Sequence, residues 1–232
     1  MSSPVCLPIL ALLFLSLLSV LRSDDFDVYN KKVHLIPSKL SCIDLPKGLD
    51  KRDMTAGAEL GVQVGLYSLN ILSSWKKCKR LYLVDMWRQQ ENYGDIANVG
   101  NDEQEKKYQE TKNRVKDYSQ TVVMIRNSTY NASFLVPDKS LDYIFIDARH
   151  DYCGAYEDLE LWYPKMKSGA LITGHDFLFA REAGQGWDLC QNGSRHMGGP
   201  KGAVIDFALS LGIPKIHFTN ERKWKCFYFT KP

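Results

Sequence analysis

The chain has 232 residues, which is enough for one substantial domain with a sizeable hydrophobic core. With 44% hydrophobic and 25% charged residues, its composition is that of a globular protein and excludes wholesale disorder. The formal net charge of +3 is small, and no Lys/Arg-rich block or interleaving of aromatic and basic residues occurs, so we expect no nucleic-acid partner.

The chain begins with an apolar run, ILALLFLSLLSVL at residues 9–21, which is followed by Arg22 and by polar and acidic residues. Its thirteen residues are fewer than the roughly twenty that span a bilayer. The run is typical of a secretory signal peptide cleaved near Ser23, although no Lys or Arg precedes it. An uncleaved membrane anchor is the alternative. We therefore assign residues 1–23 to a signal peptide or membrane anchor, and we expect a secreted or lumenal protein of the secretory pathway.

Two further features bear on the cellular compartment. Three N-x-S/T triplets, at Asn127, Asn131 and Asn192, are candidate glycosylation sites. Apart from Cys6 in the apolar run, the chain has five cysteines, so at least one thiol is free or paired between chains. No CxxC pair occurs, which argues against a structural zinc site.

Residues 24–56 are mixed and polar, and we interpret them as a lead-in segment packed on the main domain, 57–232. A regular alternation of elements begins at Ala58. In chain order, we predict a strand at 58–64, a helix at 67–78, a strand at 80–85, a loop at 88–101, a helix at 101–120, strands at 121–126 and 141–147, a helix at 155–166, a strand at 168–177, a loop at 180–200 and a helix at 201–212. Strands at 214–219 and 225–230 close the chain as a hairpin.

Strands that alternate with helices predict βαβ units. The expected fold is α/β, with a Rossmann-like, doubly wound and mainly parallel sheet that is covered by helices on both faces and ends in an antiparallel hairpin. In such sheets, ligands bind beyond the carboxyl ends of the strands. Polar residues at a strand's carboxyl end are therefore candidates for chemistry.

The first candidate site is the turn AELGVQVG, in which Glu59, Gly61 and Gly65 form an E-x-G-x-x-x-G pattern between strand and helix. Glycines let the backbone approach a ligand closely, and the following helix offers unpaired N–H groups. This is not the G-x-G-x-x-G pattern of a dinucleotide site, and the preceding carboxylate would repel a pyrophosphate. A cationic ligand without phosphate suits the turn better, and a plain connecting turn is the alternative.

The second candidate is Asp85, which ends the strand RLYLVD about twenty residues beyond the glycine turn. A carboxylate at this place can accept hydrogen bonds from both hydroxyls of a ribose. The alternative is a strand-end carboxylate that caps a turn.

The third candidate is a pair of strand ends, YIFIDARHDY and TGHDF, which carry Asp147, His150, His175 and Asp176. Neighbouring parallel strands would bring these side chains to one edge of the sheet. Carboxylates with open positions suit Mg²⁺ or Mn²⁺. His150, with an ordinary pKa of about 6.5, can accept a proton at neutral pH. A loop cap and a simply hydrogen-bonded histidine are the alternatives.

These segments resemble the class I S-adenosylmethionine (SAM)-dependent methyltransferases over roughly residues 55–232. The resemblance rests on AELGVQVG, on YLVD and on SLDYIFIDARHDYCGAYEDLELWYPKMKSGALITGHDF; the last resembles the O-methyltransferase branch that includes macrocin O-methyltransferase. The cofactor-binding residues that the resemblance implies are Glu59, Gly61, Gly65, Asp85, Asn127, Ser128 and Asp147. The first three would surround the methionine portion, Asp85 would bind the ribose, and Asn127 and Ser128 would lie near the adenine.

The same resemblance implies a divalent cation beside the methyl acceptor. Asp147 and Asp176 match Mg²⁺ ligands of metal-dependent O-methyltransferases, and His150 matches the general base. His175 stands where an acidic residue is usual, and imidazole is a poorer Mg²⁺ ligand, so it is a candidate ligand that leaves the metal open.

The expected activity is methyl transfer from SAM to a hydroxyl of a small-molecule or sugar-like acceptor. The loop at 180–200, with Trp187 and His196, would cover the acceptor site. Two alternatives stay open: a metal-dependent hydroxylase that uses His150, His175 and a carboxylate, and a catalytically silent binding domain. The acceptor and the oligomeric state are not determined by the sequence.

Overall fold

A computed structural model describes residues 33–184 and 186–232. The expected signal peptide or membrane anchor, at 1–23, lies outside these residues. The strands are β1 (His34–Pro37), β2 (Ala56–Leu60), β3 (Arg80–Asp85), β4 (Val122–Arg126), β5 (Leu141–Ile146), β6 (Met166–Gly174), β7 (Lys215–Phe218) and β8 (Phe227–Thr230). The helices are α2 (Leu66–Ser74), α3 (Asn101–Arg114), α4 (Thr129–Ser133), α5 (Tyr152–Trp162), α6 (Ala180–Ala183) and α7 (Gly199–Ser210). Short 3-10 helices are η1 (Cys42–Gly48), η2 (Asp50–Arg52), η3 (Lys116–Tyr118) and η4 (Tyr163–Lys165).

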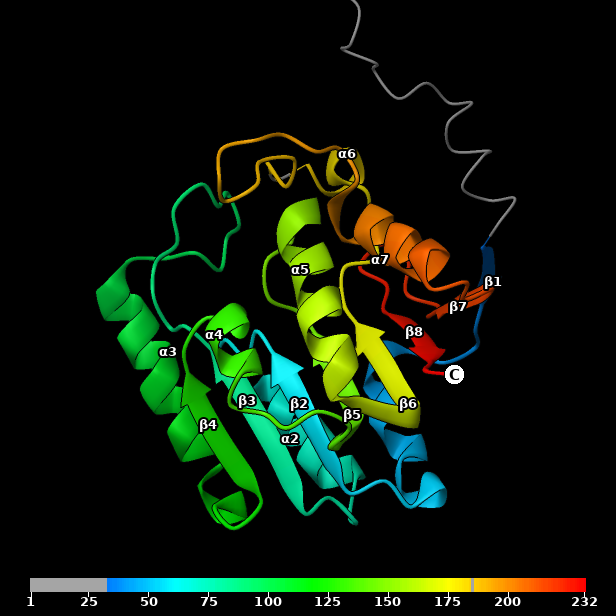
Figure 1. Ribbon diagram of the computed structural model, residues 1–232. Helices are drawn as coiled ribbons and strands as arrows, with labels where there is room; N and C mark the ends of the chain where they lie inside the picture. Colours follow the sequence, from blue (N-terminus) through cyan, green and yellow to red (C-terminus); the bar gives the residue numbers. More distant parts are fainter. Residues whose placement is uncertain (1–32, 185) are drawn as a thin grey trace, which may run out of the picture.

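The strands form one sheet in the order β1-β7-β8-β6-β5-β2-β3-β4 (Figure 1). Strand β8 runs antiparallel to both of its neighbours, β6 and β7, and the other pairs are parallel. The predicted Rossmann-like, mainly parallel sheet with a terminal antiparallel hairpin is therefore confirmed.

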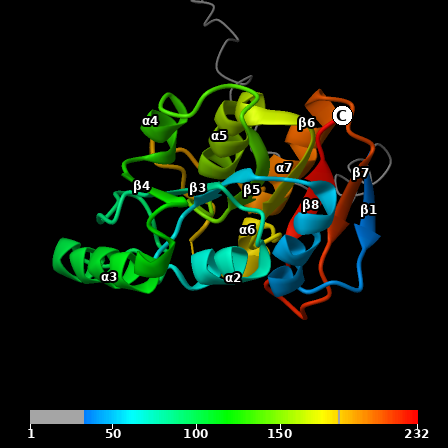
Figure 2. The ribbon, with the colours of Figure 1, turned by 90° about the horizontal axis from the view of Figure 1, so that it is seen from below.

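Helices cover both faces of the sheet, with α2 and α3 on one side and α4 and α5 on the other (Figure 2). The central strand β5 shows why both faces are covered. Its Tyr143 and Phe145 pack in the core on the α2 side, whereas Ile144 and Ile146 pack in the core beneath α5 and α7. Successive side chains of a strand point to opposite faces, so an apolar run such as LDYIFI needs a hydrophobic layer on each side.

Several boundaries of helices and strands differ from the predicted ones, and the structure shows the physical reasons. Strand β2 stops at Leu60 because Gly61 adopts a positive φ of 82°. Helix α5 begins at Tyr152, earlier than predicted, because the Asp151 side chain caps it by accepting a hydrogen bond from Gly154 N at 2.9 Å. The elements β1, α4 and α6 are each five residues or shorter, too short to show a period in the sequence.

Two disulfides join distant parts of the chain, Cys42–Cys226 and Cys153–Cys190. Within the described residues, Cys78 is the one free thiol, which accounts for the odd number of cysteines. The lead-in segment is part of the sheet through β1, and its η1 is linked to the start of β8 by the first disulfide. Among residues 33–184 and 186–232, no helix has the length and apolar character needed to cross a bilayer.

Candidate functional site

A cavity of about 840 Å³ lies at the carboxyl ends of the central strands. The two long loops that follow β3 and β6 rise above these strand ends (Figure 1). Of the residues predicted from the sequence, the cavity is lined by Gly61, Asp85, Asn127, Ser128, Asp147, His150, His175 and Asp176. Glu59 and Gly65 are not part of this lining. The fold thus gathers eight of the ten predicted residues around one space.

The glycine turn is shaped by a close approach between β2 and β5. A side chain at Gly61 would place its Cβ 1.9 Å from the backbone oxygen of Asp147, so only glycine fits there. The turn is also held by Asp85, whose Oδ2 accepts hydrogen bonds from Val62 N and Gln63 N, both at 2.9 Å. Asp85 therefore caps the turn, as the alternative prediction had it, and it also lines the cavity.

Glu59 lies beneath the turn and is 1% exposed. It accepts a hydrogen bond from the Ser68 hydroxyl, which comes from α2. Burial raises the pKa of Glu59 well above its ordinary value, and the nearby carboxylates of Asp147 and Asp85 act in the same direction. In this geometry Glu59 joins β2 to α2 and holds the turn from below.

His150 is surrounded by carboxylates on both sides of its ring. Its Nε2 lies 3.1 Å from Asp147 Oδ1 and 3.4 Å from Asp176 Oδ2. Its Nδ1 lies 3.0 Å from Asp95 Oδ2 and 3.1 Å from the Tyr93 hydroxyl. The opposite edges of the ring are thus fixed by different elements: the ends of β5 and β6 on one side and the loop after β3 on the other.

These contacts determine the protonation of the cluster. Burial alone would lower the pKa of His150, but its hydrogen bonds to Asp147 and Asp95 prevail and raise it to about 10. Burial would also lower the pKa of His175, but its hydrogen bond to Asp176 and the charge of Asp147 outweigh this effect and raise the pKa to about 9. Burial raises the pKa of Asp147. Without another cation nearby, both imidazoles therefore carry a proton at neutral pH.

Three of the predicted metal ligands meet in space. One ligand atom each from Asp147, His175 and Asp176 lies within 4.8 Å of the others. Two carboxylates and one imidazole form a donor set that fits a divalent cation such as Mg²⁺ or Mn²⁺. This set contains one histidine, His175, and His150 is not part of it.

The loop after β3 contributes Asp95 and Tyr93, which the sequence did not single out. Asp95 is buried and accepts a hydrogen bond from Trp187 Nε1 at 3.2 Å, in addition to its contact with His150. The Trp187 ring lies 4.6 Å from that of His150 and 5.8 Å from that of Trp224. An aromatic wall made of Trp187 and Trp224 therefore stands beside the cluster. These residues lie in irregular loops, where spacing carries no signal of tertiary position.

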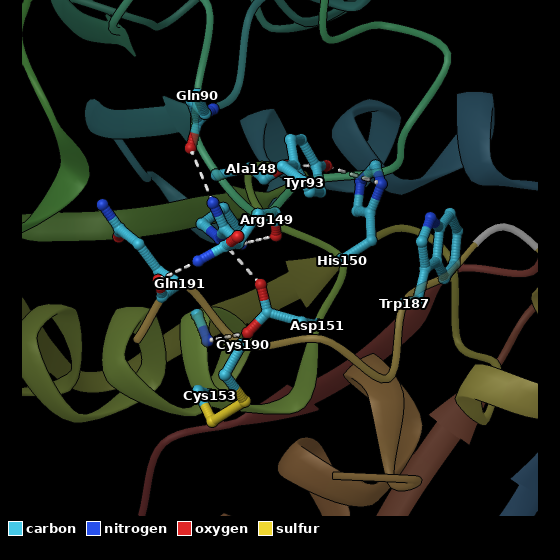
Figure 3. A network of polar contacts seen from close by, with 12 residues as sticks. Gln90, Tyr93, Ala148, Arg149, His150, Asp151, Cys153, Trp187, Cys190 and Gln191 are labelled. Carbon is cyan, nitrogen blue, oxygen red and sulfur yellow. Dashed lines mark hydrogen bonds and ion pairs between the residues drawn. A yellow bond between two sulfur atoms is a disulfide. The ribbon is translucent and has the colours of Figure 1, made fainter. Parts of the chain in front are cut away.

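Arg149 holds this loop against the end of β5 (Figure 3). Its Nε lies 2.7 Å from Asp151 Oδ2, and both side chains are largely buried. Its guanidinium also donates to the backbone oxygens of Glu91 and Asn92, at 3.2 and 2.9 Å, and lies 4.6 Å from the centre of the Tyr93 ring. On the other side, the Cys153–Cys190 disulfide ties the loop that carries Trp187 to the first turn of α5 (Figure 3).

Comparison with protein families matches residues 58–177, just over half of the chain, to a methyltransferase domain. No curated protein matches the chain. Solved structures share its fold. A Staphylococcus aureus protein assigned as a caffeoyl-CoA O-methyltransferase has a TM-score of 0.54 at 19% identity, over 89% of this chain and 90% of the other.

Two further structures show how widely the fold is used. The O-methyltransferase TomG of Streptomyces achromogenes, involved in tomaymycin synthesis and solved with SAM, has a TM-score of 0.55 at 10% identity, over 82% of this chain and 79% of the other. An rRNA methylase from Streptococcus thermophilus has a TM-score of 0.52 at 12% identity, over 82% and 93%. Such identities establish the fold and leave the acceptor open. On the family match, this chain belongs to the methyltransferase domain family.

Proposed function

We propose that this protein transfers the methyl group of SAM, the cofactor of its family, to a hydroxyl of a small-molecule or sugar-like acceptor. One observation carries the proposal: Asp85 and the His150 cluster line the same cavity. Asp85 ends β3, whereas His150 and Asp176 follow β5 and β6, with β2 between them in the sheet. A ribose at Asp85 therefore leaves the methyl group free to face the cluster.

His150 is the candidate general base. A divalent cation held by Asp147, His175 and Asp176 would lower the pKa of an acceptor hydroxyl and offset the carboxylate charge that keeps His150 protonated. A neutral His150 can then accept the hydroxyl proton at Nε2, while Asp95 and Tyr93 hold its Nδ1 edge in place. Alignment of the hydroxyl oxygen with the sulfonium methyl contributes further through positioning.

The aromatic wall supports an acceptor with a flat ring face. Trp187 and Trp224 stand beside His150, and both line the cavity. Aromatic side chains offer large apolar faces on which a planar or sugar ring can stack, while the indole N–H of Trp187 is already bound to Asp95. The wall thus suits a ring-bearing small molecule whose hydroxyl is directed towards His150.

Asp85→Ala is expected to weaken the binding of SAM and of its demethylated product by about tenfold or more, because a charged hydrogen-bond acceptor for the ribose is lost. Isothermal titration calorimetry measures this. Asp50→Ala is the matched control, since Asp50 also accepts two backbone N–H bonds, from Lys76 and Lys77, but is not among the residues that line the cavity. Equal affinities for wild type and Asp85→Ala would contradict the ribose contact.

We also propose that the protein enters the secretory pathway. Two disulfides among the described residues support this, since disulfides persist in oxidising compartments. Asn131 is exposed and does not line the cavity, as suits a glycan acceptor. Expression of the full chain in a eukaryotic cell is expected to yield a protein outside the cytosol whose mass falls on treatment with an N-glycosidase. A cytosolic protein with reduced cysteines would be the opposite result.

A further inference from the structure

Helix α4 and the residues directly after it carry an exposed apolar patch. It consists of Tyr130, Phe134 and Leu135, whose side chains are 47%, 66% and 62% exposed. The rings of Tyr130 and Phe134 meet edge to face, with their centroids 5.3 Å apart. Apolar side chains that are contiguous at the surface, unlike scattered ones, mark a place where another group packs.

A candidate glycosylation site lies inside this patch. Asn131, which begins an N-x-S triplet, is exposed on α4 and stands between Tyr130 and Phe134 in the sequence. The helical turn continues past the end of α4, since Phe134 N donates a hydrogen bond to Asn131 O at 3.3 Å. Residues three and four positions apart share one face of a helix, so Phe134 and Leu135 flank Asn131. A sugar attached to Asn131 would therefore begin beside the patch.

The Asn131 side chain can carry a sugar and keep its present contact. Its Nδ2 donates a hydrogen bond to Asn127 Oδ1 at 3.2 Å. N-glycosylation replaces one of the two amide hydrogens, and the other remains available for this bond. Because the bond restrains the amide, the first sugar starts from a defined position beside the patch.

The other two candidate sites are placed differently. Asn127 and Asn192 both line the cavity, whereas Asn131 does not. Asn127 N also donates a hydrogen bond to Asp85 O at 3.0 Å, so Asn127 lies beside the proposed ribose position. A glycan on Asn127 or Asn192 would compete for space with SAM or with the acceptor. Asn131 is the site at which a glycan is compatible with the proposed methyl transfer.

We propose that Asn131 carries an N-linked glycan whose first sugar, an N-acetylglucosamine, packs on the rings of Tyr130 and Phe134 and covers the patch. The inference rests on the proposed entry into the secretory pathway. A pyranose ring presents C–H groups on its faces, and these pack favourably on the electron-rich face of an aromatic ring. The contact removes apolar surface from water, so the glycan is expected to stabilise the folded chain.

The modification needs a donor of one chemical class, an oligosaccharide linked to a lipid diphosphate. The bond between C1 of the first sugar and the diphosphate oxygen breaks, and a bond between C1 and Asn131 Nδ2 forms. One amide proton leaves Nδ2, and the lipid diphosphate departs with the electron pair of the broken bond. No oxidation or reduction takes place.

The first test maps the glycan. The full chain is expressed in a eukaryotic cell that adds only oligomannose glycans, and its glycopeptides are analysed by mass spectrometry. Asn131 is expected to be occupied in most molecules and Asn127 in few. An unoccupied Asn131 in a protein recovered from the secretory pathway would overturn this inference alone. A cytosolic chain without any glycan would overturn the proposed route, and this inference with it.

The second test measures the contact by thermal unfolding. An endoglycosidase that leaves a single N-acetylglucosamine is expected to preserve the melting temperature of the intact glycoprotein. Asn131→Gln is expected to lower it by about 2–4 °C, the size of shift that one favourable contact gives in a domain of this length. In a Phe134→Ala background, the same substitution is expected to lower it by less than about 1 °C. This comparison isolates the contact, because an effect of Asn131→Gln unrelated to the ring persists in both backgrounds.

Leu211→Ala is the matched control background. Leu211 is an exposed apolar residue at the end of α7, outside the patch, and the loss on Asn131→Gln is expected to stay complete there. A glycosylated chain in which Phe134→Ala leaves the loss unchanged would overturn the packing of the sugar on the patch. A dimeric wild type with an unoccupied Asn131 that becomes monomeric on Phe134→Ala would make a second copy of the chain the occupant instead.

Discussion

His150→Ala is expected to lower methyl transfer about 100-fold to 10,000-fold, the contribution usual for a positioned general base, while leaving SAM binding within about threefold of wild type. The reason is geometric. His150 lies at the junction of two strand ends and a loop, with carboxylates on both ring edges. Asp85, the proposed ribose ligand, is held independently by backbone N–H groups of the glycine turn.

The measurement is turnover of an acceptor alongside calorimetric titration with SAM. His34→Ala is a suitable control, since His34 is exposed on the edge strand β1 and does not line the cavity. Thermal unfolding of His150→Ala checks the fold, because removing the imidazole leaves Asp95, Asp147 and Asp176 without their shared cation. Turnover close to that of wild type would exclude His150 as the base.

Metal removal provides a second arm of the same experiment. Treatment with a chelator is expected to abolish turnover in the wild type, and Mg²⁺ or Mn²⁺ is expected to restore it, if Asp147, His175 and Asp176 hold a cation. Full turnover by a protein that elemental analysis shows to be free of metal would contradict the role of the cation and leave the role of His150 as the base. His150 would then need another source of positive charge to lose its proton.

The sequence predicted the sheet well because its signal is local. A run such as RLYLVD or LDYIFI puts apolar side chains on both faces of its strand, so helices have to cover both faces of the sheet. The alternation of such strands with helices along the chain indicates a parallel sheet. The same rule predicted that Asp147, His150, His175 and Asp176 share one edge, since strand ends of a parallel sheet meet there. The structure brings these four side chains together.

The rest of the site depends on long-range packing that no spacing encodes. Asp95 and Trp187 come from separate irregular loops, and they meet His150 because Arg149 and the Cys153–Cys190 disulfide hold those loops down. Similarly, five cysteines allow many pairings, and the chosen pairs depend on the fold.

The Cys42–Cys226 disulfide is expected to contribute about 5 kcal/mol to the free energy of unfolding, because it closes a loop with a sequence separation of 184 residues. The double variant Cys42→Ser/Cys226→Ser is therefore expected to lose a large part of the roughly 5–15 kcal/mol typical of a domain. Denaturant titration of the oxidised wild type and the variant measures the difference. Cys78→Ser, which removes the free thiol, is the control and is expected to change stability by less than about 1 kcal/mol.

The same disulfide connects stability to the site. One sulfur each from Cys42 and Cys226 lies within 4.8 Å of a ring nitrogen of His175, a proposed metal ligand. The bridge thus fixes the lead-in segment and β8 against the carboxyl end of β6. Well below its unfolding temperature, the double variant is then expected to bind the divalent cation more weakly while keeping its affinity for S-adenosylhomocysteine, because Asp85 lies four strands away from β8. Unchanged cation affinity would show that the bridge stabilises the fold without positioning His175.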